Sequence, residues 1–300
     1  MKAKVLSVGQ CDALTVVQLA TEPLNTFGYI SYAKAIELKS VEIMESGQSG
    51  TVNEIYAINH SRHYIFIMDG DILAGAKQNR VLNTSVLLSP ESKTMIPVSC
   101  VEQGRWNHNS VNFSATDYVA PVEMRKAKSE TVAMNLISSN SFRANQVEVW
   151  DHVASYAAKM NIHSETGNLS DVYDKRSSIY EKYIAQFNCA EGANGMAFFI
   201  NGKLVNIDVF NRTDVFAEYF SKMLKGIAMD AWGVKATKEM SHAEADYKTI
   251  ETIDKLETVD FQLHKGVGLG EEKRFKTNDI TGFELDYNGN LVHLSVLSLG

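Results

Sequence analysis

The sequence predicts an α+β protein: a β-rich, mostly antiparallel part (about residues 1–122) precedes a helix-rich part with hairpins (about residues 123–300). Short strand-like runs follow one another in the first part without a helix-length crossover, which favours antiparallel pairing. After Pro121 the apolar residues recur at the helical period. From Gly195 strand-like runs return. We therefore expect both chain ends to share sheets within one continuous domain, residues 1–300.

The composition is typical of a globular protein. Hydrophobic residues make up 45% of the chain and charged residues 22%, as in ordinary globular domains. The net charge of −7 argues against a broad nucleic-acid or membrane surface, although it allows a local basic pocket. No apolar run approaches the roughly 20 residues of a membrane span. We expect a cytoplasmic protein, and the sequence does not indicate its oligomeric state.

Cysteines and histidines give no sign of a metal centre. Cys11, Cys100 and Cys189 are far apart and odd in number, which favours neither a disulfide framework nor a zinc site. His60 and His63 lie between two predicted strands, where solvated loop histidines are more common than ligands. We predict no metal site, and the sequence leaves any cofactor unknown.

The strands of the first part are short and follow one another closely. Residues 33–44 fit a strand, but residues 33–42 fit a short helix as well, and the pattern leaves both open. The expected strands are 4–11, 14–19, 27–31, 52–58, 63–68, 72–88 and 93–100.

The second part combines amphipathic helices with two hairpins. Asn201-Gly202 and Asn288-Gly289-Asn290 have the turn residues that β-hairpins require. Thr213 is expected to cap a helix that ends near Ala231. The other expected helices are 126–138, 146–160, 170–187 and 242–256, and residues 163–170 form a polar loop.

Polar residues interrupt the apolar run between residues 72 and 88. Lys77, Gln78, Asn79 and Arg80 stand inside it, and Asn83 follows. If this run were one strand, Lys77, Asn79, Asn83 and Ser85 would share a face. Polar groups inside a sheet must be paired or hydrated, so this segment is the candidate binding site.

The returning strand adds a second polar group. Ile96, Val98, Cys100 and Glu102 fall on one face, and Gly104, Arg105 and Trp106 follow. Amide, guanidinium, carboxylate and aromatic groups at one end of an apolar sheet are typical of a small-molecule pocket. The alternatives are a polar network that fixes strand register, or a solvated sheet face.

These two polar segments resemble a known protein family. The segments GAKQNRVLNTSV (75–86) and IPVSCVEQGRW (96–106) are similar to the family named for its association with ADP-ribosylglycohydrolases and rhodanese-phosphatases. Residues 195–231 and 289–297 extend the resemblance over most of the chain. It implies a link to NAD and ADP-ribose metabolism by association alone.

The hypothesis is recognition, with or without hydrolysis, of an ADP-ribose-type or NAD-derived nucleotide. The expected ligand-binding residues are Lys77, Gln78, Asn79, Arg80, Asn83, Arg105 and Trp106. Glu102 is a candidate general acid or base if burial raises its pKa, and Cys100 a nucleophile if a base lies nearby. The alternatives are a non-catalytic sensing or sequestering module and a structural or partner-binding protein, so enzyme status stays open.

Two further features are weaker candidates. Asp208 lies in an apolar strand just before a helix, and its match to the family's segment favours a site residue, with structural capping as the alternative. The glycine-rich run 266–270 could cradle phosphate with its N–H groups. It lacks the strand-then-helix context of a dinucleotide fingerprint. His293, among apolar residues near the end, is more typical of a satisfied core histidine than of a catalytic base.

Overall fold

The computed structural model describes residues 1–47 and 50–300. They form two compact units. Unit 1 comprises Met1–Phe27, Ser178–Lys265 and Glu271–Gly300, and unit 2 comprises Gly28–Ser177 and Gly266–Gly270. Unit 1 thus joins the two ends of the chain in one sheet, as the sequence predicts. That the whole chain folds as one continuous domain stays a prediction.

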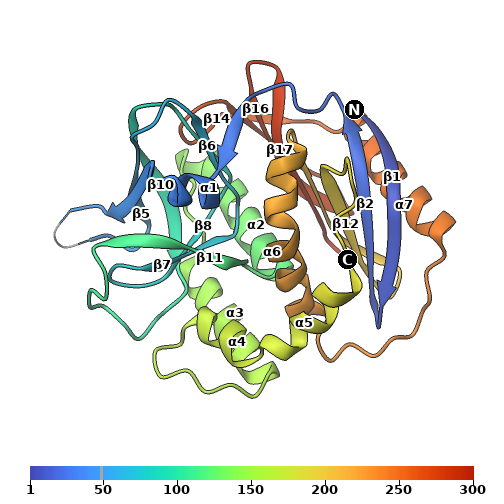
Figure 1. Ribbon diagram of the computed structural model, residues 1–300, viewed down its shortest axis with the longest axis horizontal. Helices are drawn as coiled ribbons and strands as arrows, with labels where there is room; N and C mark the ends of the chain where they lie inside the picture. Colours follow the sequence, from blue (N-terminus) through green and yellow to red (C-terminus); the bar gives the residue numbers. More distant parts are fainter. Residues whose placement is uncertain (48–49) are drawn as a thin grey trace. The chain divides into compact units, whose positions relative to one another are not determined.

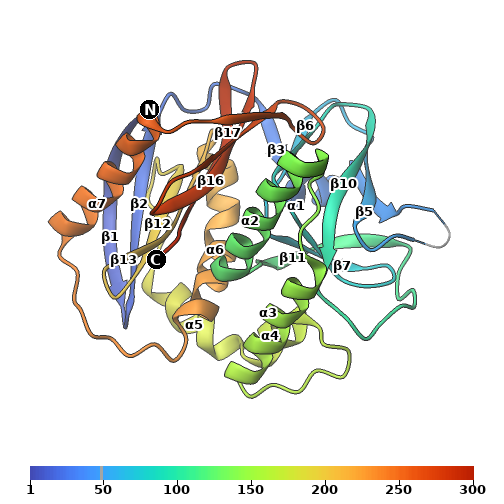
Figure 2. The same cartoon turned by 180° about the vertical axis from the view of Figure 1, so that it is seen from behind.

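Unit 1 is built on an eight-stranded antiparallel sheet with the order β1-β2-β12-β13-β17-β16-β15-β14 (Figures 1 and 2). Its strands are β1 (Lys2–Cys11), β2 (Leu14–Glu22), β12 (Gly195–Ile200), β13 (Lys203–Phe210), β14 (Gln262–Lys265), β15 (Glu271–Lys276), β16 (Ile280–Tyr287) and β17 (Asn290–Ser298). The predicted turns Asn201-Gly202 and Asn288-Gly289 close the β12–β13 and β16–β17 hairpins. Each of these asparagines has a positive φ, which asparagine tolerates better than most residues.

Helices cover both faces of this sheet. On one face, Ala245 and Ile253 of α7 (His242–Lys255) pack against Val17 and Leu19 of β2. The other face receives α6 (Thr213–Ala231), whose side chains meet Phe210. A short 3-10 turn (Leu256–Thr258) follows α7, and α5 (Ser177–Gln186) precedes β12. The sheet therefore lies between α7 on one face and α6 on the other.

Unit 2 is built on a closed six-stranded barrel with the order β10-β5-β4-β11-β7-β8. Its strands are β4 (Val41–Glu45), β5 (Glu54–Asn59), β7 (Asp71–Gly75), β8 (Arg80–Leu82), β10 (Ser92–Cys100) and β11 (Asn112–Val119). Its interior holds Ile43, Ile55, Leu73, Ile96 and Val98, all fully buried. Closure leaves the barrel no free edge.

A small sheet and several helices complete unit 2. The sheet has the order β3-β6-β9, with β3 (Tyr29–Ser31) parallel to β6 (Tyr64–Ile67) and β9 (Val86–Leu88) antiparallel to β6. The helices are α1 (Tyr32–Glu37), α2 (Val122–Ser139), α3 (Gln146–Lys159) and α4 (Leu169–Lys175). The segment left open between helix and strand contains both, since α1 is followed by β4.

Helices and mostly antiparallel sheets occur in both units, in agreement with the predicted mixed class. The helix-rich description fits residues 122–186, whereas β12 to β17 bring the sheet back after residue 195. The single helix expected over 170–187 is two, since α4 ends at Lys175 with Arg176 in a non-helical cap. Thr213 is the first helical residue, and the cap is Arg212.

Candidate functional site

The polar residues 77–79 lie in a tight turn between two barrel strands. β7 ends at Gly75 and β8 begins at Arg80. Gly75 has a φ of 124° and Ala76 one of 42°. A Cβ added to Gly75 would lie 2.5 Å from a neighbouring serine hydroxyl, so only glycine fits there. The predicted alternation of faces over residues 77–85 is therefore wrong, because the chain reverses direction between β7 and β8.

A carboxylate–guanidinium pair organises this turn. Arg105 Nε donates to Glu102 Oε1 at 2.8 Å, and Arg105 Nη2 donates to Glu102 Oε2 at 2.6 Å. Arg105 Nη1 also donates to Ala76 O at 2.7 Å. Glu102 Oε2 accepts a further bond from the Asn79 N–H at 3.0 Å. This bidentate geometry is the strong form of the ion pair, and it brings Glu102, Arg105 and Asn79 together.

The environment of Glu102 favours its ionised form. Burial by itself raises the pKa of this carboxyl, but the bonds from Arg105, the Asn79 N–H and the Thr166 hydroxyl outweigh burial and lower the pKa below its usual value. Both carboxylate oxygens are engaged. The condition set for a general acid, a raised pKa, is not met. In this structure Glu102 is an anion that holds the turn.

The loop at residues 163–170 is tied to the same residues. Gly104 N donates to Thr166 O at 2.7 Å, and Leu169 N donates to Val101 O at 2.9 Å. Asn79 Nδ2 donates to Asn168 Oδ1 at 3.1 Å. A Cβ at Gly104 would lie 2.9 Å from the Thr166 Cα, so glycine allows this close approach. The loop and the turn therefore form one hydrogen-bonded network.

Trp106 presents the exposed surface of this region. Its side chain is 43% exposed. Lys77 Nζ lies 5.3 Å and Arg80 Cζ 5.6 Å from the centroid of its ring. Both distances allow cation–π attraction. The turn thus places a partly exposed indole beside two cationic side chains, of which Arg80 is fully buried and Lys77 nearly so.

Glu45, at the end of β4, is a member of the site that the sequence reasoning missed. Its Oε1 accepts from the Lys77 N–H at 3.2 Å and lies 3.6 Å from Arg80 Nη2. Its side chain is 5% exposed. The alternation in β4 gives the missing signal: Glu45 shares the inward face of Val41 and Ile43, where a carboxylate needs a partner.

The remaining amide residues have separate roles. Gln78 Oε1 accepts from Arg80 Nη1 at 2.8 Å and so orients the guanidinium. Asn83 bonds elsewhere: its Oδ1 accepts from Ser99 Oγ at 2.8 Å and its Nδ2 donates to Phe142 O at 3.1 Å. Gln78 therefore belongs with the Trp106 cluster, whereas the bonds of Asn83 link β10 to the loop after α2.

Cys100 has the environment of a structural thiol. Its side chain is fully buried, and its Sγ donates to Glu102 O at 3.2 Å. Burial raises the pKa of the Cys100 thiol above its usual value, which opposes formation of the nucleophilic thiolate. Gln146 of α3 accepts from Cys100 N and donates to Cys100 O, both at 2.8 Å. These bonds hold the end of β10 in place.

Asp208 lies in unit 1, on β13. Its Oδ1 is 3.4 Å from His293 Nε2 on the neighbouring strand β17. Both side chains are fully buried. Asp208 and His293, both considered as candidates from the sequence, therefore lie next to each other in unit 1. Glu102 belongs to unit 2.

The glycine-rich run 266–270 has a structural contact of its own in unit 2. Leu269 N donates to Leu87 O at 2.9 Å, next to β9. Gly268 has a φ of 76°, and a Cβ there would lie 2.4 Å from Leu87 O. A glycine is required at 268 because the backbone approaches β9 this closely. This contact accounts for Gly268 without a phosphate.

A fully buried ionic cluster lies elsewhere in unit 2. Asp69 Oδ2 accepts from Arg125 Nε at 3.1 Å, and Asp69 Oδ1 accepts from Lys128 Nζ at 3.0 Å. The Lys128 ammonium also contacts Leu82 O. Arg125 and Lys128 are one turn apart on α2, so they reach Asp69 from the same helix face. Buried charges paired in this way fix the position of α2 on the barrel.

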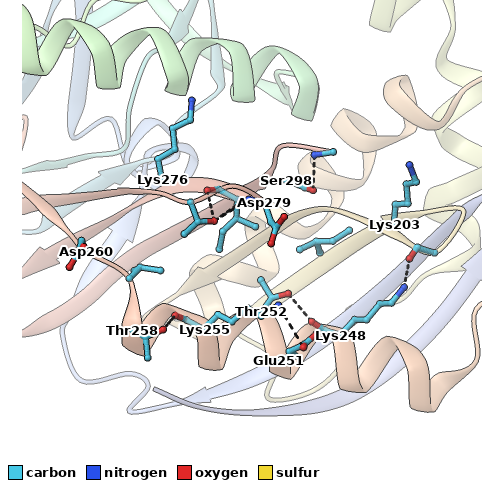
Figure 3. A pocket seen from close by; sticks show the side chains of 16 residues that line it. Lys203, Lys248, Glu251, Thr252, Lys255, Thr258, Asp260, Lys276, Asp279 and Ser298 are labelled. Atoms are coloured by element: carbon cyan, nitrogen blue, oxygen red, sulfur yellow. Dashed lines mark hydrogen bonds and ion pairs between the residues drawn. The ribbon is translucent and has the colours of Figure 1, made fainter.

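Unit 1 also has a groove of 630 Å³ beside α7. Figure 3 shows its lining side chains, with Lys248 and Glu251 on the helix and Lys203 and Lys276 on the sheet. Lys248 Nζ donates to Gly202 O at 2.7 Å and lies 2.9 Å from Glu244. The groove volume lies within the range of ligand sites. Two of its lysines, however, are paired with carboxylates: Lys248 with Glu244, and Lys255 with Glu251 at 3.6 Å.

No three His, Cys, Asp or Glu side chains within residues 1–47 and 50–300 gather as a metal site. Over the same residues, none of the helices combines the length and apolar character needed to cross a membrane.

Comparison with known proteins gives one match. Residues 2–297 match the model of the family described as "ARG and Rhodanese-Phosphatase-superfamily-associated Protein domain". Comparisons with curated proteins and with solved structures give no significant match. Because the family model spans nearly the whole sequence, the chain belongs to the ARG and rhodanese-phosphatase-superfamily-associated protein domain family.

Proposed function

We propose that unit 2 binds an ADP-ribose-type or NAD-derived nucleotide at the Trp106 cluster, which consists of Glu45, Lys77, Gln78, Arg80 and Trp106. One observation carries this proposal: a partly exposed indole lies within 5.6 Å of two cationic groups. A nucleotide combines an aromatic base, which stacks on an indole, with phosphates, which cations attract.

The charge balance of the site supports an anionic ligand. Lys77, Arg80 and Arg105 carry positive charge, and Glu45 and Glu102 carry negative charge. Arg105 is bound to Glu102 and Arg80 lies 3.6 Å from Glu45, so the five charged side chains leave one net positive charge, which lies with Lys77. The chain as a whole has a net charge of −7, so this is a local reversal of sign. The family name adds an association with ADP-ribose chemistry, which is a weaker argument.

The geometry favours binding over turnover. Glu102 is held as an anion by four hydrogen bonds, and Cys100 is a buried thiol with a raised pKa. Neither environment activates a catalytic group. A sensing or sequestering module therefore agrees better with the site than a hydrolase that uses Glu102 or Cys100.

A ligand screen separates the three classes of function. NAD, ADP-ribose, cyclic ADP-ribose and sugar phosphates are added singly, thermal stability is measured, and each mixture is then analysed by mass spectrometry. A binding module gives saturable stabilisation with the ligand unchanged, because ligand that binds only the folded state raises the melting temperature. A new product mass indicates an enzyme. A structural or partner-binding protein gives neither stabilisation nor product, and this result would contradict the proposal.

A further inference from the structure

Two polar atoms inside the Trp106 cluster have no hydrogen-bond partner among the described residues. They are Glu45 Oε2 and Arg80 Nε. Both atoms are inaccessible to solvent, and the side chains that carry them are 5% and 0% exposed. Polar atoms this deeply buried are nearly always bonded to protein or to ordered water. Each of the two atoms therefore lacks a hydrogen bond that a further group could supply.

The two atoms specify what that group is. A carboxylate oxygen only accepts, so Glu45 Oε2 requires a donor, and Arg80 Nε–H requires an acceptor. A phosphate oxygen would meet repulsion from Glu45, and an ammonium would meet repulsion from Arg80 and Lys77. A hydroxyl donates and accepts at once and carries no charge. It is the simplest uncharged group that can bond to either atom.

Glu45 Oε2 lies next to a glycine, Gly50. Gly50 has a φ of 68°, and a Cβ added to it would lie 3.1 Å from Oε2 and 3.4 Å from Lys77 Cδ. The backbone of Gly50 therefore borders this oxygen without a side chain. Arg80 lies beside Trp106, with its Cζ 5.6 Å from the ring centroid. A sugar attached to a base on Trp106 is thus close to the same ion pair.

We propose that Glu45 and Arg80 form a hydroxyl-reading subsite that recognises the ribose of the bound nucleotide. This inference rests on the proposed function. It assigns the specificity for sugar hydroxyls to Glu45, which is not among the binding residues predicted from the sequence. Rejection of deoxy analogues follows, because without the hydroxyl Glu45 Oε2 and Arg80 Nε stay unbonded in the complex.

The test compares ribose with deoxyribose. Calorimetry measures the Kd of AMP, 2′-deoxy-AMP and 3′-deoxy-AMP with the full chain. We expect AMP to bind about tenfold or more tightly than at least one deoxy analogue. In Glu45→Gln the ratio falls below about threefold, because an amide N–H replaces the charged acceptor and the proton of the hydroxyl is left without a partner. The matched control Glu42→Gln, on the exposed face of the same strand β4, keeps the wild-type ratio.

A second variant covers the case that Glu45→Gln does not fold, which circular dichroism reports. Gly50→Ala leaves Glu45 in place and puts a methyl group against Oε2, so it also removes the ribose preference. A wild-type ratio near one, or an unchanged ratio in both variants, overturns the inference and indicates a buried water only.

Free sugars separate this inference from the proposed function. If no nucleotide binds, the proposed function fails, and ligand-observed NMR with D-ribose and 2-deoxy-D-ribose decides the subsite alone. Contact with D-ribose only, lost in Glu45→Gln, supports the subsite without a nucleotide. Equal signals from both sugars, or none from either, overturn it.

Discussion

The guanidinium of Arg105 holds both carboxylate oxygens of Glu102, with N–O distances of 2.8 and 2.6 Å. Three segments meet at this pair: the turn after Gly75, the end of β10 and the loop at 163–170. The pair is thus the junction that positions Trp106, the residue that follows Arg105. We expect loss of the Glu102–Arg105 pair to destabilise the fold of the site, whether or not the site is catalytic.

Glu102→Gln should destabilise unit 2. The substitution leaves the largely buried Arg105 guanidinium without its counter-charge, and breaking a buried pair in this way costs about 3 kcal/mol. Urea unfolding followed by tryptophan fluorescence measures the change. Glu123→Gln, at an exposed pair on α2, should cost less than about 1 kcal/mol. Equal losses for the two variants would show that the pair is not a junction.

Acid should remove the same stabilisation. The pKa of Glu102 in the folded state is below its usual value of 4.5, so the contribution is complete above that pH. It declines as pH falls from 4.5 through the lower folded-state pKa, where Glu102 becomes protonated in both states. The difference in unfolding free energy between wild type and Glu102→Gln should therefore shrink below pH 4.5. A difference that grows on acidification would contradict the assigned direction.

Gly268→Ala should destabilise the contact of the glycine-rich run with β9. The new Cβ would lie 2.4 Å from Leu87 O, and overpacking of this kind costs about 1–3 kcal/mol beyond the strain of a positive φ. Gly167→Ala is the matched control in unit 2, since it has a φ of 59° and its nearest neighbour would be at 3.8 Å. Urea denaturation of both variants gives the comparison. If Gly167→Ala is as damaging, the close approach to Leu87 is not what requires glycine.

The cysteines should differ in reactivity. Cys189 is exposed and Cys100 fully buried. Iodoacetamide at pH 8, followed by peptide mass spectrometry, should label Cys189 in the folded protein and Cys100 only after unfolding. Labelling of Cys100 at a rate equal to that of Cys189 would restore it as a candidate nucleophile.

Local patterns predicted much of the fold. The helical period located α3 and α7 to within a residue or two, and Asn201-Gly202 located a hairpin, because these signals lie within one element. The break between β7 and β8 was missed. Apolar residues continue on both sides of it, and the need for glycine at 75 arises from a serine far along the chain.

The same distinction applies to the site. Lys77, Arg80, Glu102, Arg105 and Trp106 were predicted to converge, and the structure brings them together in one turn network, although its function stays a proposal. Glu45 was missed because its partners are more than 30 residues away in sequence. Sequence spacing also could not show that Asn83 bonds to Ser99 and Phe142. Contacts between distant segments follow from barrel closure, which no local pattern encodes.

The most direct test of nucleotide binding at Trp106 is calorimetric titration of ADP-ribose into wild type, Trp106→Ala and Trp232→Ala. Trp232 is the matched control, since it is 40% exposed but lies in unit 1. Base stacking contributes about 1–3 kcal/mol, so Trp106→Ala should weaken binding by about five- to 150-fold, with Trp232→Ala equal to wild type. Unchanged affinity in Trp106→Ala, or no binding to the wild-type protein, would contradict the assignment.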